Sequence, residues 1–393
     1  MFRNIAISRA FCCSAQYNFH VALGIIEMKY PLGNMKAATD LTKSGKLLEA
    51  TALIQRMLSK NAQPDPADFK AAPWQQPKLS SIGQGQKAAD AEVATRVADS
   101  RVSEPRVRNE QGQFESKQFS CALGQRPYKL FTPSGYLGQP LPLIIMLHGC
   151  TQTPDDFAAG TKMNELGEQR GFFVAYPAQP SSANASRCWN WFNSADQQKD
   201  RGEPALIAGI VREIMAHHAV DPKRVYVAGL SAGGAMAAVL GMTYPDLFAA
   251  IGVHSGLPCG AAKDVVSAFT VMKRGACHAV VSRAVQPVPT IVFHGDRDRT
   301  VNPANADDVL EQFDPAGTSA QYETTFEKSA MGLSYAKSVH ANDQGTATFE
   351  KWLVHGAGHA WSGGSSHGSY TEPRGPDASR EMIRFFFEHR LAT

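Results

Sequence analysis

The pentapeptide Gly229-Leu230-Ser231-Ala232-Gly233 lies between a short run rich in β-branched residues, 224–228, and a run of small apolar residues, 232–243. A G-x-S-x-G sequence in that context predicts a nucleophile elbow, which is a sharp turn from a strand into a helix. Glycine is needed at both ends because a Cβ there would collide with a neighbouring strand or helix. We therefore expect a strained backbone at Ser231, with its hydroxyl exposed above a sheet. A glycine-rich turn without catalysis is the alternative.

Strands and helices alternate on both sides of this turn. The predicted strand segments are apolar throughout, which indicates a mostly parallel sheet with helices on both faces, so the fold class is α/β. Hydrophobic periodicity predicts strands at 128–132, 143–146, 172–176, 224–228, 249–253, 290–293 and 348–353, and helices at 155–170, 203–218, 232–243 and 379–388.

The chain of 393 residues, 43% of them hydrophobic, is long enough for several domains. We expect an unstructured N-terminus over 1–34, a short helical hairpin over 35–59, a flexible Pro- and Gly-containing linker over 60–113, and a catalytic domain over 114–393. The hairpin buries little by itself, so it is expected to dock on the main domain, bind a partner or pair with a second copy.

Composition excludes several classes of function. A net charge of +3 without a basic tract gives no reason to expect a nucleic-acid partner. The longest apolar runs fall far short of the roughly 20 residues that a membrane span needs. Seven cysteines fit no CxxC metal spacing, so we expect no metal and no cofactor. The apolar stretch near the N-terminus is interrupted by polar residues, so no clean signal peptide is visible.

A serine nucleophile needs a base and an acid that orients it, in the chain order Ser, Asp or Glu, His. The segment 294–301 follows a predicted strand and contains two carboxylates. Asp298 is the predicted acid because it lies beyond the turn at Gly295, whereas Asp296 lies within the turn and is expected to cap it. His359 is the predicted base because it lies in a glycine-flanked loop after the strand at 348–353, whereas His355 ends that strand.

Two further segments complete the predicted site. The oxyanion hole requires two backbone N–H groups, which we assign to Ala232, directly after the nucleophile, and to Cys150, in the His148-Gly149-Cys150 loop. The segment Cys188-Trp189-Asn190-Trp191-Phe192 is a candidate substrate wall, formed by Trp189, Asn190 and Trp191. Core packing beneath a long loop is the alternative for the two tryptophans, and they could divide these tasks between them.

The motifs 147–152, 188–192, 229–233, 255–258 and 358–361 together resemble the poly(3-hydroxybutyrate) depolymerase family of esterases, neighbours of the feruloyl and acetylxylan esterases. The resemblance covers roughly residues 114–393. It implies an α/β-hydrolase fold and a triad of Ser231, Asp298 and His359.

The resemblance also implies a serine carboxylester hydrolase that cleaves poly- or oligo-3-hydroxybutyrate or similar short esters through an acyl-enzyme. No segment after this domain looks like a polymer-binding module, so action on insoluble polymer is not expected. A feruloyl or acetylxylan esterase is the alternative, and a non-catalytic polymer- or carbohydrate-binding protein is the alternative of another class. Relatives imply an extracellular or periplasmic location, and the lack of a clean signal peptide keeps the cytoplasm as the alternative.

Overall fold

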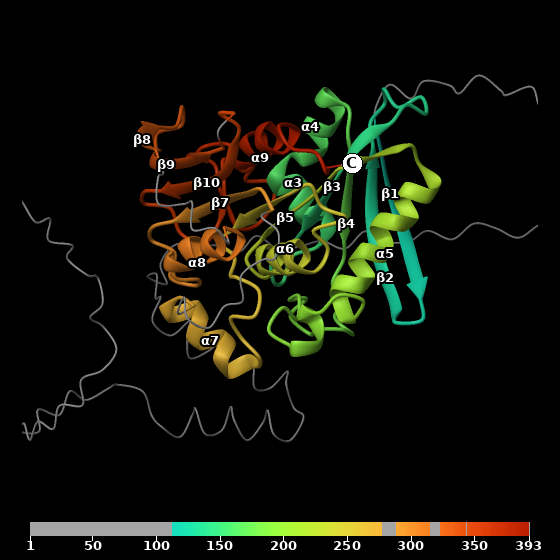
Figure 1. Ribbon diagram of the computed structural model, residues 1–393, viewed down its shortest axis with the longest axis horizontal. Helices are drawn as coiled ribbons and strands as arrows, with labels where there is room; N and C mark the ends of the chain where they lie inside the picture. Colours follow the sequence, from blue (N-terminus) through green and yellow to red (C-terminus); the bar gives the residue numbers. More distant parts are fainter. Residues whose placement is uncertain (1–111, 277–287, 315–322, 343, 393) are drawn as a thin grey trace, which may run out of the picture. The chain divides into compact units, whose positions relative to one another are not determined.

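The computed structural model describes residues 112–276, 288–314, 323–342 and 344–392 (Figure 1). The expectations for the N-terminus at 1–34 and the helical hairpin at 35–59 lie outside the described residues, as does the linker at 60–113 except for its last two positions. The fold that follows is therefore that of the predicted catalytic domain.

A ten-stranded sheet forms the centre of this domain, in the order β1-β2-β4-β3-β5-β6-β7-β10-β9-β8 (Figure 1). Its middle strands, from β4 to β10 in that order, pair in parallel. Antiparallel strands extend the sheet at both ends. The strands are β1 Gln113–Cys121, β2 Gly124–Thr132, β3 Leu141–Leu147, β4 Phe173–Pro177, β5 Val220–Leu230, β6 Ala250–His254, β7 Thr290–Gly295, β8 Glu323–Lys328, β9 Ser334–Ala341 and β10 Ala347–Val354.

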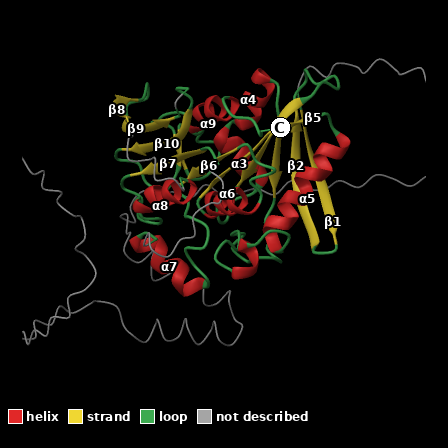
Figure 2. Ribbon diagram, viewed as in Figure 1, coloured by secondary structure: helices red, strands yellow, loops and turns green. Residues whose placement is uncertain are grey.

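Helices cover both faces of the sheet (Figure 2). Side chains alternate across β3, so Ile145 joins one buried cluster and Ile144 joins the other. The first cluster includes residues of α5 Gly202–His217, α6 Ala232–Thr243, α7 Val265–Arg274 and α8 Ala304–Phe313. The second includes residues of α3 Pro154–Thr161, α4 Met163–Arg170 and α9 Ala378–Phe387. The three-layer α/β prediction is thus confirmed. A short parallel pair, β11 Trp361–Ser362 and β12 Thr371–Glu372, lies outside this sheet.

The prediction was wrong or incomplete for several elements. The single helix expected at 155–170 is two helices, α3 and α4, because Lys162 adopts a left-handed conformation with φ 55° between them. The strands β1, β8, β9, β11 and β12 and the helices α7 and α8 were not predicted. Six of the nine residues of β1 and all six of β8 are exposed, so neither strand has the continuous apolar pattern of a buried one.

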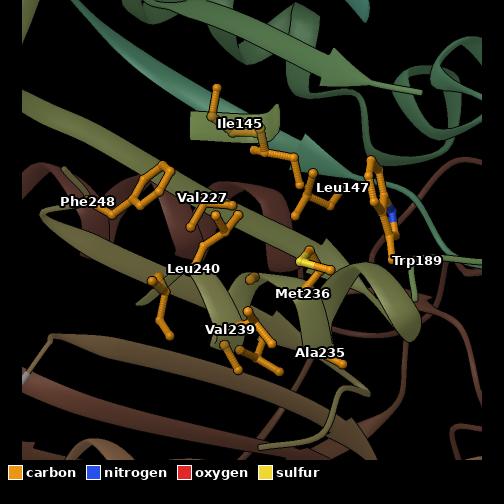
Figure 3. Close-up of a cluster of buried hydrophobic side chains, with 14 of the residues drawn as sticks. Ile145, Leu147, Trp189, Val227, Ala235, Met236, Val239, Leu240 and Phe248 are labelled. Carbon is orange, nitrogen blue, oxygen red and sulfur yellow. The ribbon is translucent and has the colours of Figure 1, made fainter. Parts of the chain in front are cut away.

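Small residues bring α6 close to the sheet. Met236 and Leu240 of this helix lie in the buried cluster drawn in Figure 3 together with Leu147 of β3 and Val227 of β5. At the beginning of the helix, a Cβ added to Gly233 would lie 2.0 Å from the carbonyl oxygen of Leu147. Only glycine allows the helix N-terminus to lie this close to the end of β3.

We predict that Gly233→Ala lowers the free energy of unfolding by about 3 kcal/mol or more, because the added methyl meets backbone atoms that cannot rotate away. Chemical denaturation followed by circular dichroism measures this loss. Gly135→Ala is the matched control, since a Cβ there has no atom within 4 Å, and its effect should stay within about 0.5 kcal/mol. Equal stability of the two variants would contradict the close approach.

Candidate active site

Ser231 lies at the turn from β5 into α6 with φ 57° and ψ −118°, a conformation that a non-glycine residue rarely adopts. Its backbone N–H donates to the carbonyl oxygen of His254, at the end of β6, over 2.9 Å. A Cβ at Gly229 would lie 2.3 Å from the backbone of Gly233. The turn is therefore as tight as the motif predicts, and its neighbours hold the strained serine in place.

The predicted acid and base lie together. His359 Nδ1 donates to Asp298 Oδ2 over 2.6 Å, and the second carboxylate oxygen, Oδ1, accepts the N–H groups of Thr300 and Val301 at 2.8 and 2.9 Å. The side chain of Asp298 is fully buried, and that of His359 is 14% exposed. Because Nδ1 carries the proton that Asp298 accepts, Nε2 of the neutral ring keeps the lone pair that a general base needs.

A second Asp–His pair lies beside the first. His355 Nδ1 is 3.0 Å from Asp296 Oδ2, and the other oxygen of Asp296 accepts the N–H of Gly356. Both side chains are about one third exposed, at 33% for the acid and 38% for the imidazole. Asp296 therefore caps the beginning of the histidine loop, which agrees with the capping role expected from its place in the turn.

The pKa of Asp298 lies well below its ordinary value. Burial acts to raise this pKa, but hydrogen bonding to His294 and His359 and the N–H of Val301 outweigh it. His294 is itself completely buried, and its Nε2 lies 3.0 Å from the carbonyl oxygen of Val301 and 3.4 Å from Asp298 Oδ2. Asp298 thus stays ionised across the range in which enzymes ordinarily work.

His254 connects the serine turn to the histidine loop. Its carbonyl oxygen accepts the Ser231 N–H, and its Nε2 accepts the backbone N–H of Ser362, three residues beyond His359. Burial lowers the pKa of His254 well below the usual range, and the electrostatic effect of the neighbouring His294 and His359 lowers it further. His254 is thus a neutral buried group between the two loops, and it fixes the position of one relative to the other.

Ser231, Asp298 and His359 follow β5, β7 and β10 respectively, three parallel strands whose carboxyl ends share one edge of the sheet. Among the described residues, the Ser231 hydroxyl has no hydrogen-bond partner. Catalytic hydrogen bonds are often long in structures without substrate and shorten in the reacting complex. The arrangement therefore brings Asp298 and His359 into direct contact and leaves the serine hydroxyl available to a substrate.

The predicted oxyanion loop lies against the serine. A Cβ at Gly149 would lie 3.6 Å from the Cβ of Ser231. The Gly149 N–H donates to Gln152 Oε1 over 2.9 Å, which braces the loop from within. Neither the Cys150 N–H nor the Ala232 N–H has a hydrogen-bond partner in the part of the chain that the structure describes. A tetrahedral oxyanion is stabilised where two backbone N–H groups point at it, which is the role predicted for this pair.

Cys150 forms a disulfide with Cys188, which sequence reasoning left unassigned. The bond ties the oxyanion loop to the 188–192 segment across 38 positions of sequence. Spacing alone could not identify this pair, because seven cysteines allow many pairings. The free cysteines among the described residues are Cys121, which is exposed, and Cys259, which is buried.

The candidate substrate wall is largely internal, and here the structure corrects the prediction. Trp189 is completely buried and Trp191 is 5% exposed, both within the main hydrophobic cluster. The Trp189 Nε1–H donates to the carbonyl oxygen of His148 over 3.0 Å, so this ring supports the oxyanion loop from below. Packing beneath a loop, the alternative from sequence, is the arrangement found for both tryptophans. Asn190 is only partly buried.

A buried charge centre holds this segment in place. Glu203, at the N-terminus of α5, accepts the backbone N–H of Asn190 at 2.7 Å and its side-chain amide at 2.9 Å. Arg126 of β2 lies 3.7 Å from the same carboxylate, and Gln179 bridges from Glu203 to the carbonyl oxygen of Cys188. Burial raises the pKa of Glu203, which the hydrogen bonds from Asn190 and Gln179 oppose.

His148 completes the support of the loop. Its Nε2 accepts the N–H of Gln179 at 3.1 Å, and its Nδ1 lies 2.8 Å from the carbonyl oxygen of Gly149. The ring is therefore neutral, with its proton on Nδ1. Burial lowers the pKa of His148 to about 4, although the hydrogen bond to the Gly149 carbonyl oxygen acts to raise this pKa.

Comparison with known proteins agrees with this geometry. Residues 126–319 match the family described as Esterase PHB depolymerase, PHB being poly(3-hydroxybutyrate). The chain is 36% identical over 238 residues to poly(3-hydroxyalkanoate) depolymerase C of Paucimonas lemoignei. This alignment covers 58% of the chain and 56% of the relative. It is 30% identical over 189 residues to feruloyl esterase B of Thermothelomyces thermophilus, covering 44% of this chain and 64% of that protein. The chain thus spans between about half and two thirds of these relatives.

A solved structure supports the fold. The acetyl xylan esterase of Aspergillus awamori superposes with a TM-score of 0.56 at 19% sequence identity, covering 70% of this chain and 99% of that one. At this level of identity the similarity establishes the α/β-hydrolase fold. Within the described residues, no helix is both long and apolar enough to cross a membrane, and no group of three or more metal-ligating side chains is present.

We predict that the double variant Cys150→Ala/Cys188→Ala lowers the free energy of unfolding by about 4 kcal/mol. Without the disulfide, the loop between these two positions, which are 38 residues apart, no longer restricts the conformations of the unfolded chain. Denaturant titration measures the effect, and Cys121→Ser is the matched control because its thiol is free and exposed. A double variant as stable as the control would contradict a stabilising disulfide.

We also predict that His148 makes stability depend on pH. The unfolded chain takes up a proton on this residue near pH 6.5, whereas the folded protein does so only at about 4. Between these values the unfolded state binds more protons, so the stability provided by His148 is lost as the pH falls, by about 3 kcal/mol in all. Thermal or denaturant unfolding from pH 7 to pH 4 should show a shallower decline in His148→Gln. Parallel declines in the two proteins would rule out this contribution.

Proposed function

We propose that this chain, which carries an Esterase PHB depolymerase domain, hydrolyses carboxylic esters through an acyl-serine intermediate. The observation that carries the proposal is the hydrogen bond of 2.6 Å between His359 and the buried Asp298, at the same sheet edge as the strained Ser231. An ionised acid fixes the imidazole with Nε2 unprotonated, which is what a serine nucleophile requires.

The proposed reaction has two halves. His359 Nε2 removes the proton of Ser231 Oγ while Oγ bonds to the ester carbonyl carbon, and the N–H groups of Cys150 and Ala232 hold the resulting oxyanion. The bond to the alcohol oxygen then breaks, and His359 returns the proton to that oxygen. Water repeats the sequence on the acyl-enzyme, which releases the carboxylic acid and regenerates the serine. Asp298 keeps the imidazole oriented and stabilises its positive charge throughout.

We propose hydroxyalkanoate esters, such as soluble oligomers of 3-hydroxybutyrate, as the substrates. The match to the Esterase PHB depolymerase family and the 36% identity to a poly(3-hydroxyalkanoate) depolymerase support this class. Feruloyl or acetylxylan esters are the second candidate, because the chain is also 30% identical to a feruloyl esterase. We also propose an extracellular or periplasmic location for this protein, because a disulfide such as Cys150–Cys188 is stable in an oxidising compartment.

We predict that Ser231→Ala and His359→Ala each reduce kcat for 3-hydroxybutyrate oligomers by about 10⁴- to 10⁶-fold, and that Asp298→Asn reduces it by about 10⁴-fold. Release of 3-hydroxybutyrate measures the rate, in parallel with feruloyl and acetyl esters to compare substrate classes. A fluorophosphonate probe should label Ser231 in the folded wild type.

The neighbouring pair supplies a matched control. Asp296→Asn and His355→Ala alter an Asp–His hydrogen bond of similar kind on the same two loops, and both variants should keep kcat within about tenfold of the wild type. A loss in these controls as large as in Asp298→Asn and His359→Ala would overturn the assignment. Absence of a Ser231 adduct in the folded wild type would exclude the enzyme and favour the binding-protein alternative.

A further inference from the structure

The segment that follows His359 packs onto the oxyanion loop. Asp156 of α3 accepts both the N–H and the hydroxyl of Ser369, and Gln152 Nε2 donates to the Ser369 carbonyl oxygen over 3.1 Å. A Cβ at Gly368 would lie 2.4 Å from Gly160 of the same helix. Residues 368–370 are thus fixed against the element that begins directly after the oxyanion loop.

Tyr370 is the exposed member of this fixed segment. Its hydroxyl lies 3.3 Å from Thr151 Oγ1, and Thr151 directly follows the proposed oxyanion donor Cys150. The Thr151 hydroxyl donates to the Cys150 carbonyl oxygen over 2.6 Å, so the tyrosine is the donor of the pair. The residue remains 48% exposed although its backbone and its hydroxyl are both held. A large aromatic side chain held in one place but left in contact with solvent is available to a ligand.

Strained backbone conformations cluster around Tyr370 and Thr151. Among the described residues, seven non-glycine residues have positive φ, and five of them lie in segments around the proposed site: Thr151, Arg187, Ser231, Ser255 and Tyr370. Thr151 and Tyr370, with φ 68° and 54°, are hydrogen-bonded to each other. Strained residues persist where the surroundings determine them strongly, and they cluster at sites that bind or react. The Tyr370 carbonyl oxygen accepts the N–H of the buried Trp361 over 2.7 Å, which holds the backbone, whereas the Tyr370 side chain belongs to neither buried cluster.

We propose that Tyr370 determines substrate specificity by packing its ring against the ester unit next to the one being cleaved. This inference rests on the proposed function. In a hydroxyalkanoate oligomer that neighbouring unit carries an apolar methyl branch and methylene, which suit an aromatic face, and a further oxygen-bearing ester group, which suits the phenol. A small monoester has no neighbouring unit, so the ring contributes less to its binding.

The test compares a soluble 3-hydroxybutyrate trimer with p-nitrophenyl acetate in the wild type and in Tyr370→Ala. The ratio of kcat/KM for the trimer to kcat/KM for the monoester should fall about five- to tenfold in the variant, mainly through KM, since one apolar contact is lost. Tyr370→Phe keeps the ring and loses the hydrogen bond to Thr151, so its ratio should lie between those of the wild type and Tyr370→Ala.

Phe326→Ala is the matched control, because Phe326 is an exposed aromatic residue of the edge strand β8. It should leave the ratio unchanged. Thermal melting of each variant separates a specificity effect from a folding defect. An equal change in kcat/KM for trimer and monoester in Tyr370→Ala would overturn the role of the ring while leaving the hydrolase intact. A wild type that cleaves neither substrate and binds no fluorophosphonate would instead overturn the proposed function, and the inference with it.

Discussion

The close approach of α6 to the end of β3 is the constraint on which the rest of the site depends. The Gly233 Cα lies so near the Leu147 carbonyl oxygen that no side chain fits between them. This contact places the beginning of the oxyanion loop, at His148 and Gly149, directly beside the turn that carries Ser231. The nucleophile and its proposed oxyanion donors are therefore positioned by backbone packing, which is more rigid than a contact between flexible side chains.

Two buried carboxylates hold the remaining parts. Asp298 receives two backbone N–H groups and the imidazole of His359, so its ionised form is fully solvated by the protein. Glu203 holds the segment that contains Cys188 and Asn190: its carboxylate accepts the Asn190 N–H and lies near Arg126. A buried charge without such partners would be strongly destabilising, so each carboxylate fixes the segments that supply its donors. In this way the histidine loop and the disulfide-bonded segment are each tied to the sheet.

The sequence predicted the parts of the site that depend on local chemistry. The elbow at 229–233 and the strand–loop pattern that places Asp298 and His359 at one sheet edge can be read from motif and periodicity. The Cys150–Cys188 disulfide, the Glu203 centre and the packing of Ser369 on Asp156 could not be predicted, because each joins residues whose separation in sequence carries no signal. The tryptophans of 188–192 were ambiguous for the same reason: an aromatic cluster in a loop looks alike whether it faces a substrate or supports the loop.

The two Asp–His pairs explain why geometry alone does not identify the base. The register of β7 and β10 places Gly295 beside Val354, so Asp296 and His355 are the first residues beyond paired strand ends and meet almost automatically. Their exposure leaves the interaction screened by water, which weakens the attraction between the carboxylate and the imidazole. Asp298 and His359 lie further along the same loops, where burial excludes water from the carboxylate and every oxygen has a donor. A carboxylate in that environment orients an imidazole more strongly, which favours His359 as the group that takes the Ser231 proton.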